Sequence, residues 1–224
     1  RWNRKDAKLT LIYIDSKKQN STYPVNVGAI PKIFPQLPNV VDIWKNQEGV
    51  TISKNFITID KSANIKIEQE VLLPKTHSLL VESGATINII NGGLLRAEGR
   101  VKMTGTAREK IFVSIQSGYD QDSRPIWGGI LFMNQTDIKH TVFSGNVMQF
   151  PNRQDIRGLT SCVTAYKANI KISHTSFKNL QCEDALNVVN GDIYMDNSEV
   201  YGVAADALDS DFSTGIIKNS TFIN

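Results

Sequence analysis

The chain has 224 residues, of which 25 are basic and 22 acidic, so its formal net charge is only +3. This balance, without a basic run interleaved with aromatic residues, argues against a nucleic-acid partner. No segment approaches the ~20 consecutive apolar residues of a membrane span. We therefore expect no membrane span in this chain, whose length is sufficient for one sizeable hydrophobic core.

The first fifty residues differ from the rest. Residues Leu9 to Ile14 are typical of a strand, and Pro24, Pro31 and Pro35 then favour an extended chain. So few apolar residues do not support a separate domain. The sequence predicts an extended N-terminal arm at residues 1–50, which packs along or caps a domain at residues 51–224.

Short strand-like runs follow, separated by glycine and proline residues that favour turns. The candidate strands are Val71–Leu73, Leu79–Val81, Thr86–Ile89, Val101–Met103 and Ile111–Val113.

The last sixty or so residues repeat at a short interval. The run Asp184–Asn187 returns as Asp206–Asp209 after 22 residues, and other matches are offset by 23 residues. Within each unit, apolar positions alternate with positions that hold polar as well as apolar residues. We therefore expect Ile172, Met195 and Ile217 to line the interior. A β repeat of this length must stack on copies of itself to bury its apolar face. The sequence thus predicts an all-β fold, a right-handed parallel β-helix with coils of about 22–23 residues.

One earlier unit contains an insertion. The run Ile138–Phe143 matches Ile172–Phe177 at an offset of 34 residues, which is one unit plus about 11 residues. We place the additional residues in a loop within Asn146–Arg157, where a solenoid tolerates them.

The runs Leu79–Ile87, Leu95–Gly99 and Trp127–Ile130 resemble the opening of bacterial extracellular right-handed β-helix domains of the pectin-lyase-like superfamily. The repeated Asp-Ala-Leu runs at Asp184 and Asp206 resemble a subgroup found with spore-coat-protein-H-like kinases. The resemblance covers roughly residues 50–224. It implies a secreted or cell-surface bacterial protein. The superfamily includes lyases, hydrolases, epimerases, adhesins and spacers, so the resemblance does not specify an activity.

Four polar residues occupy equivalent positions in successive units. These are His140, His174, Asn197 and Asn219, each followed by Thr or Ser. They are expected to stack at one turn as a hydrogen-bonded ladder with neutral imidazoles. A metal or catalytic pair of histidines would instead need a third converging ligand or carboxylate.

A candidate binding strip follows from the repeat register. If Leu186 and Leu208 point inward, Asn187 and Asp209 point outward, with Thr164 one coil earlier. Tyr166 and Asp211 belong to a second outward column. We expect the ligand-binding residues, if the chain binds glycans, to be Thr164, Tyr166, Asn187, Asp209 and Asp211.

The acidic residues of this region leave three roles open. Asp184 and Asp206 could accept backbone N–H groups in turns. Asp206, Asp209 and Asp211 are candidate Ca²⁺ ligands, although no cofactor is required by any motif. Two carboxylates could also supply a glycosidase pair. A lyase would need a Lys or Arg base, and none is evident in the two columns, so we assign no catalytic residue.

Cys162 and Cys182 are the only cysteines. The repeat register places Cys182 beside residue 159, which lies about three residues along the strand from Cys162. The resulting Cα–Cα distance between the two cysteines exceeds the ~7 Å limit for a disulfide. We favour two separate buried thiols, while a secreted protein could pair them.

Two function classes remain open. The first is a non-catalytic extracellular β-helix, acting as a surface scaffold or carbohydrate-binding module, with a polysaccharide or cell-surface component as partner. The second is a polysaccharide lyase or hydrolase of the pectin-lyase-like kind. Because an uncapped last coil would expose open sheet edges, further C-terminal coils or a partner are expected to cover that end.

Overall fold

The computed structural model describes residues 10–14, 20–24, 37–119, 125–146, 160–180 and 182–223. The chain divides into two compact units, residues 1–36 and residues 37–224. In the first unit, β1 (Thr10–Ile14) pairs antiparallel with β2 (Asn20–Pro24). Residues 37–50, which the sequence assigned to the arm, therefore belong to the second unit.

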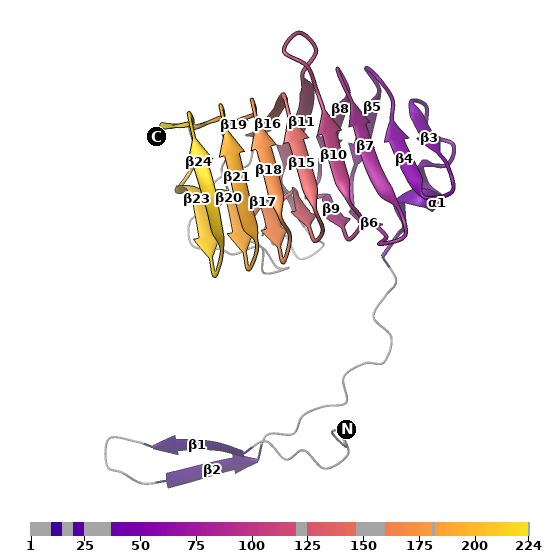
Figure 1. Ribbon diagram of the computed structural model, residues 1–224. Helices are drawn as coiled ribbons and strands as arrows, with labels where there is room; N and C mark the ends of the chain where they lie inside the picture. The colour runs from indigo at the N-terminus through magenta and orange to yellow at the C-terminus, as the bar shows by residue number, and fades with distance from the viewer. Residues whose placement is uncertain are drawn as a thin grey trace. The chain divides into compact units, whose positions relative to one another are not determined.

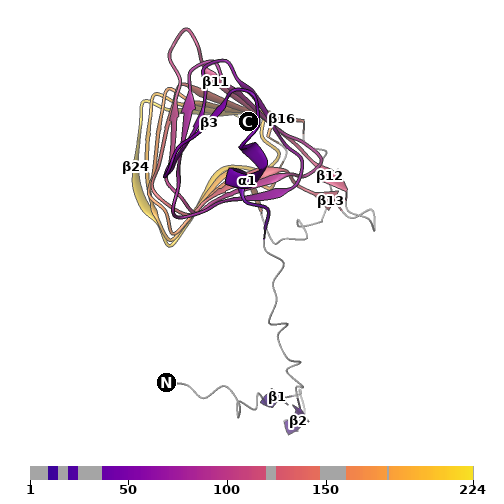
Figure 2. The ribbon, with the colours of Figure 1, turned by 90° about the vertical axis from the view of Figure 1, so that its right-hand side faces the viewer.

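The second unit is a parallel β-helix, as the repeat predicted. Strands of three sheets alternate along the chain, so each coil contributes one strand to every sheet (Figure 1). Seen along the axis, the coils superimpose as a three-sided outline (Figure 2). The five strands expected between Val71 and Val113 are all present. Sheet 1 contains β3 (Val50–Ile52), β4 (Phe56–Ile59), β7 (Ser78–Glu82), β10 (Val101–Thr104), β15 (Thr136–Lys139), β18 (Ile170–Ser173), β21 (Asp192–Asp196) and β24 (Thr214–Lys218).

Sheets 2 and 3 complete the coils, and a short antiparallel pair leaves the solenoid. Sheet 2 contains β5 (Asn64–Ile67), β8 (Thr86–Ile89), β11 (Ile111–Gln116), β16 (Thr141–Asn146), β19 (Ser176–Lys178), β22 (Glu199–Tyr201) and β25 (Thr221–Ile223). Sheet 3 contains β6 (Glu70–Leu73), β9 (Leu94–Ala97), β14 (Gly129–Phe132), β17 (Ser161–Tyr166), β20 (Asp184–Val189) and β23 (Asp206–Asp211), and β12 (Gly118–Tyr119) pairs with β13 (Pro125–Ile126).

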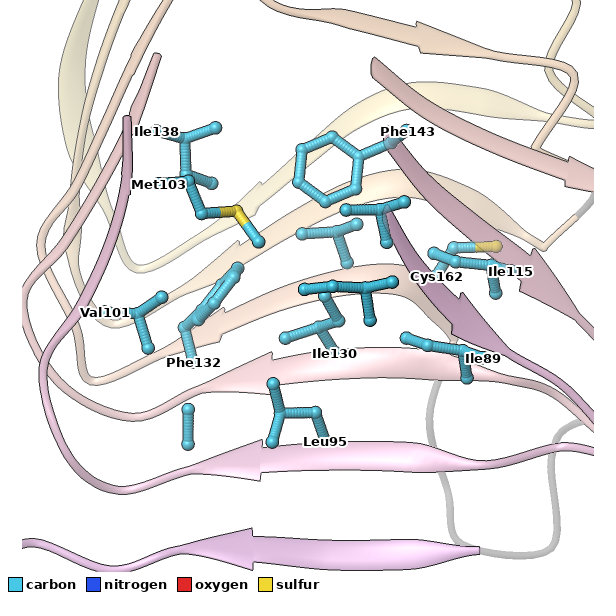
Figure 3. Packing of buried hydrophobic residues seen from close by; sticks show 14 of the residues in the cluster. Ile89, Leu95, Val101, Met103, Ile115, Ile130, Phe132, Ile138, Phe143 and Cys162 are labelled. Carbon is cyan, nitrogen blue, oxygen red and sulfur yellow. The ribbon is translucent and has the colours of Figure 1, made fainter. Parts of the chain in front are cut away.

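The core consists of inward side chains that repeat in columns along the axis. Ile172 pairs in register with Met195, and Met195 with Ile217, which confirms the predicted column. Phe143 and Phe177 stack with ring centroids 4.8 Å apart, the spacing of paired strands. Figure 3 shows such residues pointing from all three walls into one interior. Ile217 remains 41% exposed because its coil stacks on a neighbour on one side only among the described residues.

A short helix covers the N-terminal end of this core. α1 (Val40–Trp44) is capped by Asn39, whose side chain accepts a hydrogen bond from the Val41 N–H at 2.9 Å. Val40 and Trp44 are buried in the core cluster, and α1 lies across the mouth of the solenoid in Figure 2. β3 pairs antiparallel with the outer edge of β4. These elements block an edge that would otherwise pair with another chain.

The range predicted to hold the insertion, Asn146–Arg157, falls between β16, which ends at Asn146, and β17, which begins at Ser161. Residues 147–159, which hold most of the predicted loop, lie outside the described residues.

Cys162 and Cys182 form a disulfide with a Cα–Cα distance of 5.6 Å, so the prediction of separate thiols was wrong. The prediction extended the strand register to Cys182, but β20 begins only at Asp184. Cys182 lies on a bend before that strand, where the straight-ladder distance does not apply. Both cysteines are buried in the core, and the bridge joins adjacent coils.

Candidate functional site

The predicted strip lies on the outer side of sheet 3. Thr164 pairs in register with Asn187, and Asn187 with Asp209. Tyr166 and Asp211 occupy the second column, on either side of Val189. The structure therefore brings the five predicted residues together on β17, β20 and β23.

The inner and outer sides of these strands do not alternate regularly. Cys162 and Val163 are consecutive, and both belong to the core cluster. Ser161 and Thr164 flank them and share a hydrogen bond of 2.6 Å between their hydroxyl groups. In a regular strand, residues three apart would point to opposite faces. Here Ser161 and Thr164 lie on the same outer side.

The next coil repeats this arrangement with stronger polar groups. Ala185 and Leu186 both belong to the core cluster. Asp184 and Asn187 flank them, and the Asn187 Nδ2 group donates to Asp184 Oδ2 at 3.4 Å. The same nitrogen atom lies 3.3 Å from Thr160 Oγ1 and 3.2 Å from Asp209 Oδ2. The polar cluster, defined as Thr160, Ser161, Thr164, Asp184, Asn187 and Asp209, thus spans three coils.

Two predicted ligand-binding residues are buried within this cluster. Thr164 is only 9% exposed and Asn187 only 6% exposed. Both side chains leave the solenoid interior, as predicted, but they do not lie on its accessible surface. Hydrogen bonds hold the Thr164 hydroxyl group and the Asn187 Nδ2 group, which explains why these two groups tolerate burial. The Oδ1 atom of Asn187 is buried without a hydrogen-bond partner among the described residues.

Asp184 is the most electrostatically perturbed carboxyl group described. Its pKa is raised from 3.8 to about 6, primarily because burial disfavours the charged form. The negative charges of Asp209 and Glu183 act in the same direction, and hydrogen bonds from Thr160 and Asn187 oppose them. Asp184 therefore holds a proton to a much higher pH than an ordinary aspartate.

The accessible part of the strip consists of Tyr166, Asp209 and Asp211. Tyr166 is 37% exposed, and Asp211 is exposed on the second coil beyond it. Lys167 Nζ lies 5.1 Å from the centre of the Tyr166 ring, within the range of a cation–π contact. This surface combines an aromatic ring, one ammonium group and two carboxyl groups.

The sequence contained a signal for the remaining cluster residues. Ser161-x-x-Thr164, Asp184-x-x-Asn187 and Asp206-x-x-Asp209 share a polar-x-x-polar spacing at the same place in consecutive coils. The strand period of two conceals this relationship, so sequence reasoning missed Thr160 and Ser161. Sequence reasoning also predicted that the Thr164 and Asn187 side chains point outward, but it did not predict that they are buried.

The predicted stacking of the two histidines and two asparagines is confirmed at the corner between sheets 1 and 2, whereas the side-chain hydrogen bonds and neutral imidazoles of the prediction are not tested. His140, His174, Asn197 and Asn219 all have left-handed backbone conformations, with φ between 47° and 50°. The backbone N–H groups of His140, His174 and Asn197 each donate to a carbonyl group of the next coil, as His174 does to Asp196 at 3.1 Å. The His140 and His174 ring centroids are 4.7 Å apart. The pKa of His140 is lowered, first by burial and then by the charge of His174.

Within the described ranges, no three His, Cys, Asp or Glu residues form a group that could hold a metal ion. Asp206, Asp209 and Asp211, the candidate Ca²⁺ ligands, therefore do not constitute such a group.

The described helix is too short and too polar to cross a membrane.

No protein-family model matches the chain, and no significant match was found among curated proteins or solved structures.

Proposed function

We propose that the chain is a non-catalytic extracellular β-helix domain of the pectin-lyase-like kind, which acts as a bacterial surface scaffold and binds carbohydrate. Its partner would be a polysaccharide or another cell-surface component. The disulfide supports an oxidising location, because such bonds persist mainly in secreted and surface proteins. The in-register stack supports the scaffold role, since each coil adds a fixed increment of length.

The observation that carries the binding proposal is the exposed Tyr166 ring on the same side of sheet 3 as Asp209 and Asp211, which lie two coils further on. An aromatic ring covers the apolar face of a sugar, and neighbouring carboxylates accept hydrogen bonds from its hydroxyl groups. Lys167 restricts one approach to the ring because its ammonium group lies over it. The buried Thr164 and Asn187 would support this surface by fixing Asp209 rather than by touching the sugar.

One observation favours the alternative, a hydrolase. Asp184 has a pKa of about 6, which suits a general acid, and Asn187 bridges it to Asp209. Against this alternative, Asp184 is only 3% exposed, so a glycosidic oxygen would not reach it without local opening. A lyase is less well supported, because neither column supplies a basic residue.

Isothermal titration with uronate and neutral oligosaccharides tests the proposed strip. Tyr166→Ala and Asp209→Ala should each weaken binding, and Tyr119→Ala provides a matched control because Tyr119 is an exposed tyrosine of the β12–β13 pair. Unchanged binding in both strip variants would exclude the strip as the carbohydrate-binding site. Equal weakening in the control would indicate that the effect is not local.

A further inference from the structure

A second surface feature lies on sheet 1, around the corner from the strip. A shallow groove of about 560 Å³ runs across β15, β18, β21 and β24, parallel to the solenoid axis. Three spacings of ~4.8 Å give it a length of about 14 Å. One side carries Asn169, Asp192 and Thr214, which occupy successive coils. This length suits a short chain molecule better than a single small ring.

The opposite side of the groove carries a column of different chemistry. Lys171, Tyr194 and Ile216 are paired in register on consecutive coils. Tyr194 is half-buried, so its ring has a restricted orientation, and Lys171 Nζ lies 5.7 Å from its centre. Ile216 is 52% exposed and continues the apolar surface beyond the ring.

The floor of the groove is formed by the intervening column. Ile170 and Ile193 point into the core and are almost fully buried, which leaves mainly their backbone towards the groove. Gly215 extends this floor on the last coil. A Cβ atom at position 215 would lie only 2.1 Å from the Ile193 carbonyl oxygen, so the close approach of these strands requires glycine.

The position of the groove decides between classes of ligand. It lies over β18 and β21, whose backbone groups are already paired with strands on both sides. Strand addition requires a free sheet edge, and among the described strands of the groove only β24 has one; a peptide added there would run across the groove and not along it. Recognition must therefore use side chains. Among the described lining residues, Lys171 is the only cation, which is too little positive charge for a nucleic acid.

The charges within the groove balance. Lys171 provides one positive charge and Asp192 one negative charge, and Asp192 accepts a hydrogen bond from the Thr214 hydroxyl group. A ligand with several carboxylates would have no set of cations to pair with. Hydroxyl groups, in contrast, match the amide of Asn169 and the carboxylate of Asp192. The Tyr194 ring is partly exposed, and a sugar would stack on the side of the ring away from Lys171 Nζ.

We propose that this groove is a separate binding site for a short neutral oligosaccharide that lies along the solenoid axis and stacks on Tyr194. The inference rests on the proposed carbohydrate-binding function, but it assigns that function to residues outside the strip and specifies an uncharged ligand. Tyr194 provides the stacking surface, and Asn169 and Asp192 orient the hydroxyl groups.

Titration calorimetry on the complete chain tests this site, with cellohexaose and mannohexaose as neutral probes and hexagalacturonate as the charged comparison. Tyr194→Ala should weaken binding of a neutral probe about tenfold, as expected for the loss of one stacked ring. Tyr119→Ala is the matched control, because Tyr119 is an exposed tyrosine outside both proposed sites, and this variant should bind that probe as the wild type does. Tyr194→Phe should also retain binding, since it keeps the ring. Circular dichroism melting of each variant verifies that the fold is intact.

The other outcomes separate the two proposals. Loss of binding in Tyr166→Ala with unchanged binding in Tyr194→Ala would overturn the groove and leave the strip in place. Tighter binding of hexagalacturonate than of both neutral probes would overturn the assignment of a neutral ligand. If the wild type bound none of the probes, both the groove and the proposed carbohydrate-binding function would be contradicted.

Discussion

The Asn187 Nδ2 group donates a hydrogen bond to Asp209 Oδ2 in the next coil at 3.2 Å. The same amide contacts Asp184, so it joins two carboxyl groups of which one is almost fully buried. This arrangement makes the stability of the solenoid depend on the protonation of Asp184.

We predict that Asp184 makes the protein less stable as the pH rises. The folded pKa of about 6 lies above the ordinary value of 3.8, so folding favours the protonated form. The associated stability is fully present below pH 3.8 and is lost as the pH rises through about 6. The difference between these two pKa values corresponds to about 3 kcal/mol of unfolding free energy. Asp184→Asn should therefore gain stability relative to the wild type between pH 4 and pH 8, as urea unfolding would measure.

Asp206→Asn is the matched control for this experiment. Asp206 pairs in register with Asp184 one coil further on, but it is exposed. Its substitution should leave the pH dependence of the unfolding free energy unchanged. A constant difference between Asp184→Asn and the wild type across this pH range would contradict the burial of an ionisable group at Asp184.

The disulfide should contribute about 3 kcal/mol to the unfolding free energy, as expected for a loop of 20 residues. Urea unfolding of the wild type with and without dithiothreitol measures this contribution. The double variant Cys162→Ala, Cys182→Ala should be destabilised and should no longer respond to the reductant. An identical unfolding midpoint of the wild type under both conditions would show that the two cysteines are not bridged.

Hydroxyl groups beside the ladder connect successive coils. Ser198 Oγ accepts a hydrogen bond from the Thr175 N–H at 3.2 Å and donates one to the Asp196 carbonyl group at 2.9 Å. Ser198→Ala would leave the buried Thr175 N–H without this partner and should cost about 1–3 kcal/mol. Ser198→Thr is the control and should remain close to the wild type, because threonine occupies the equivalent position in the preceding coils. Equal stability of the two variants in thermal melting would refute the role of the hydroxyl group.

Phe212 has an unfavourable backbone conformation for its residue type. Its φ of 51° lies in the left-handed region, and its side chain is 92% exposed. Asn190 has a φ of 53° and donates its N–H to the Asp211 carbonyl group in the next coil. Because asparagine tolerates this conformation better than phenylalanine, Phe212→Asn should stabilise the protein by about 0.5–1 kcal/mol. A lower melting temperature would indicate that the phenyl ring has a stabilising contact.

The sequence predicted those features that depend on strict repetition. The column of Ile172, Met195 and Ile217 and the ladder at His140 and His174 follow from equal spacing between coils. It failed where local geometry departs from the repeat. The disulfide involves a residue on a bend before β20, so register arithmetic did not apply.

Burial of the strip was also beyond sequence reasoning. Thr164 and Asn187 point outward as predicted, but hydrogen bonds to Ser161, Thr160 and Asp184 enclose them. Two consecutive inward residues, such as Cys162 and Val163, interrupt the alternation on which the prediction relied. The groove beside Tyr194 includes Gly215 in its floor, where the close approach to the Ile193 carbonyl group is a feature that a pattern of strands does not specify.

The central claim is that this β-helix binds carbohydrate without converting it. The most direct measurement incubates the wild type with the oligosaccharides that it binds in calorimetry and follows reducing ends and ultraviolet absorbance over time. We predict binding with no increase in either signal, at pH 5 as well as at pH 8. New reducing ends that disappear in Asp184→Asn would reveal a hydrolase, and absorbance from unsaturated products would reveal a lyase; either result would contradict the claim.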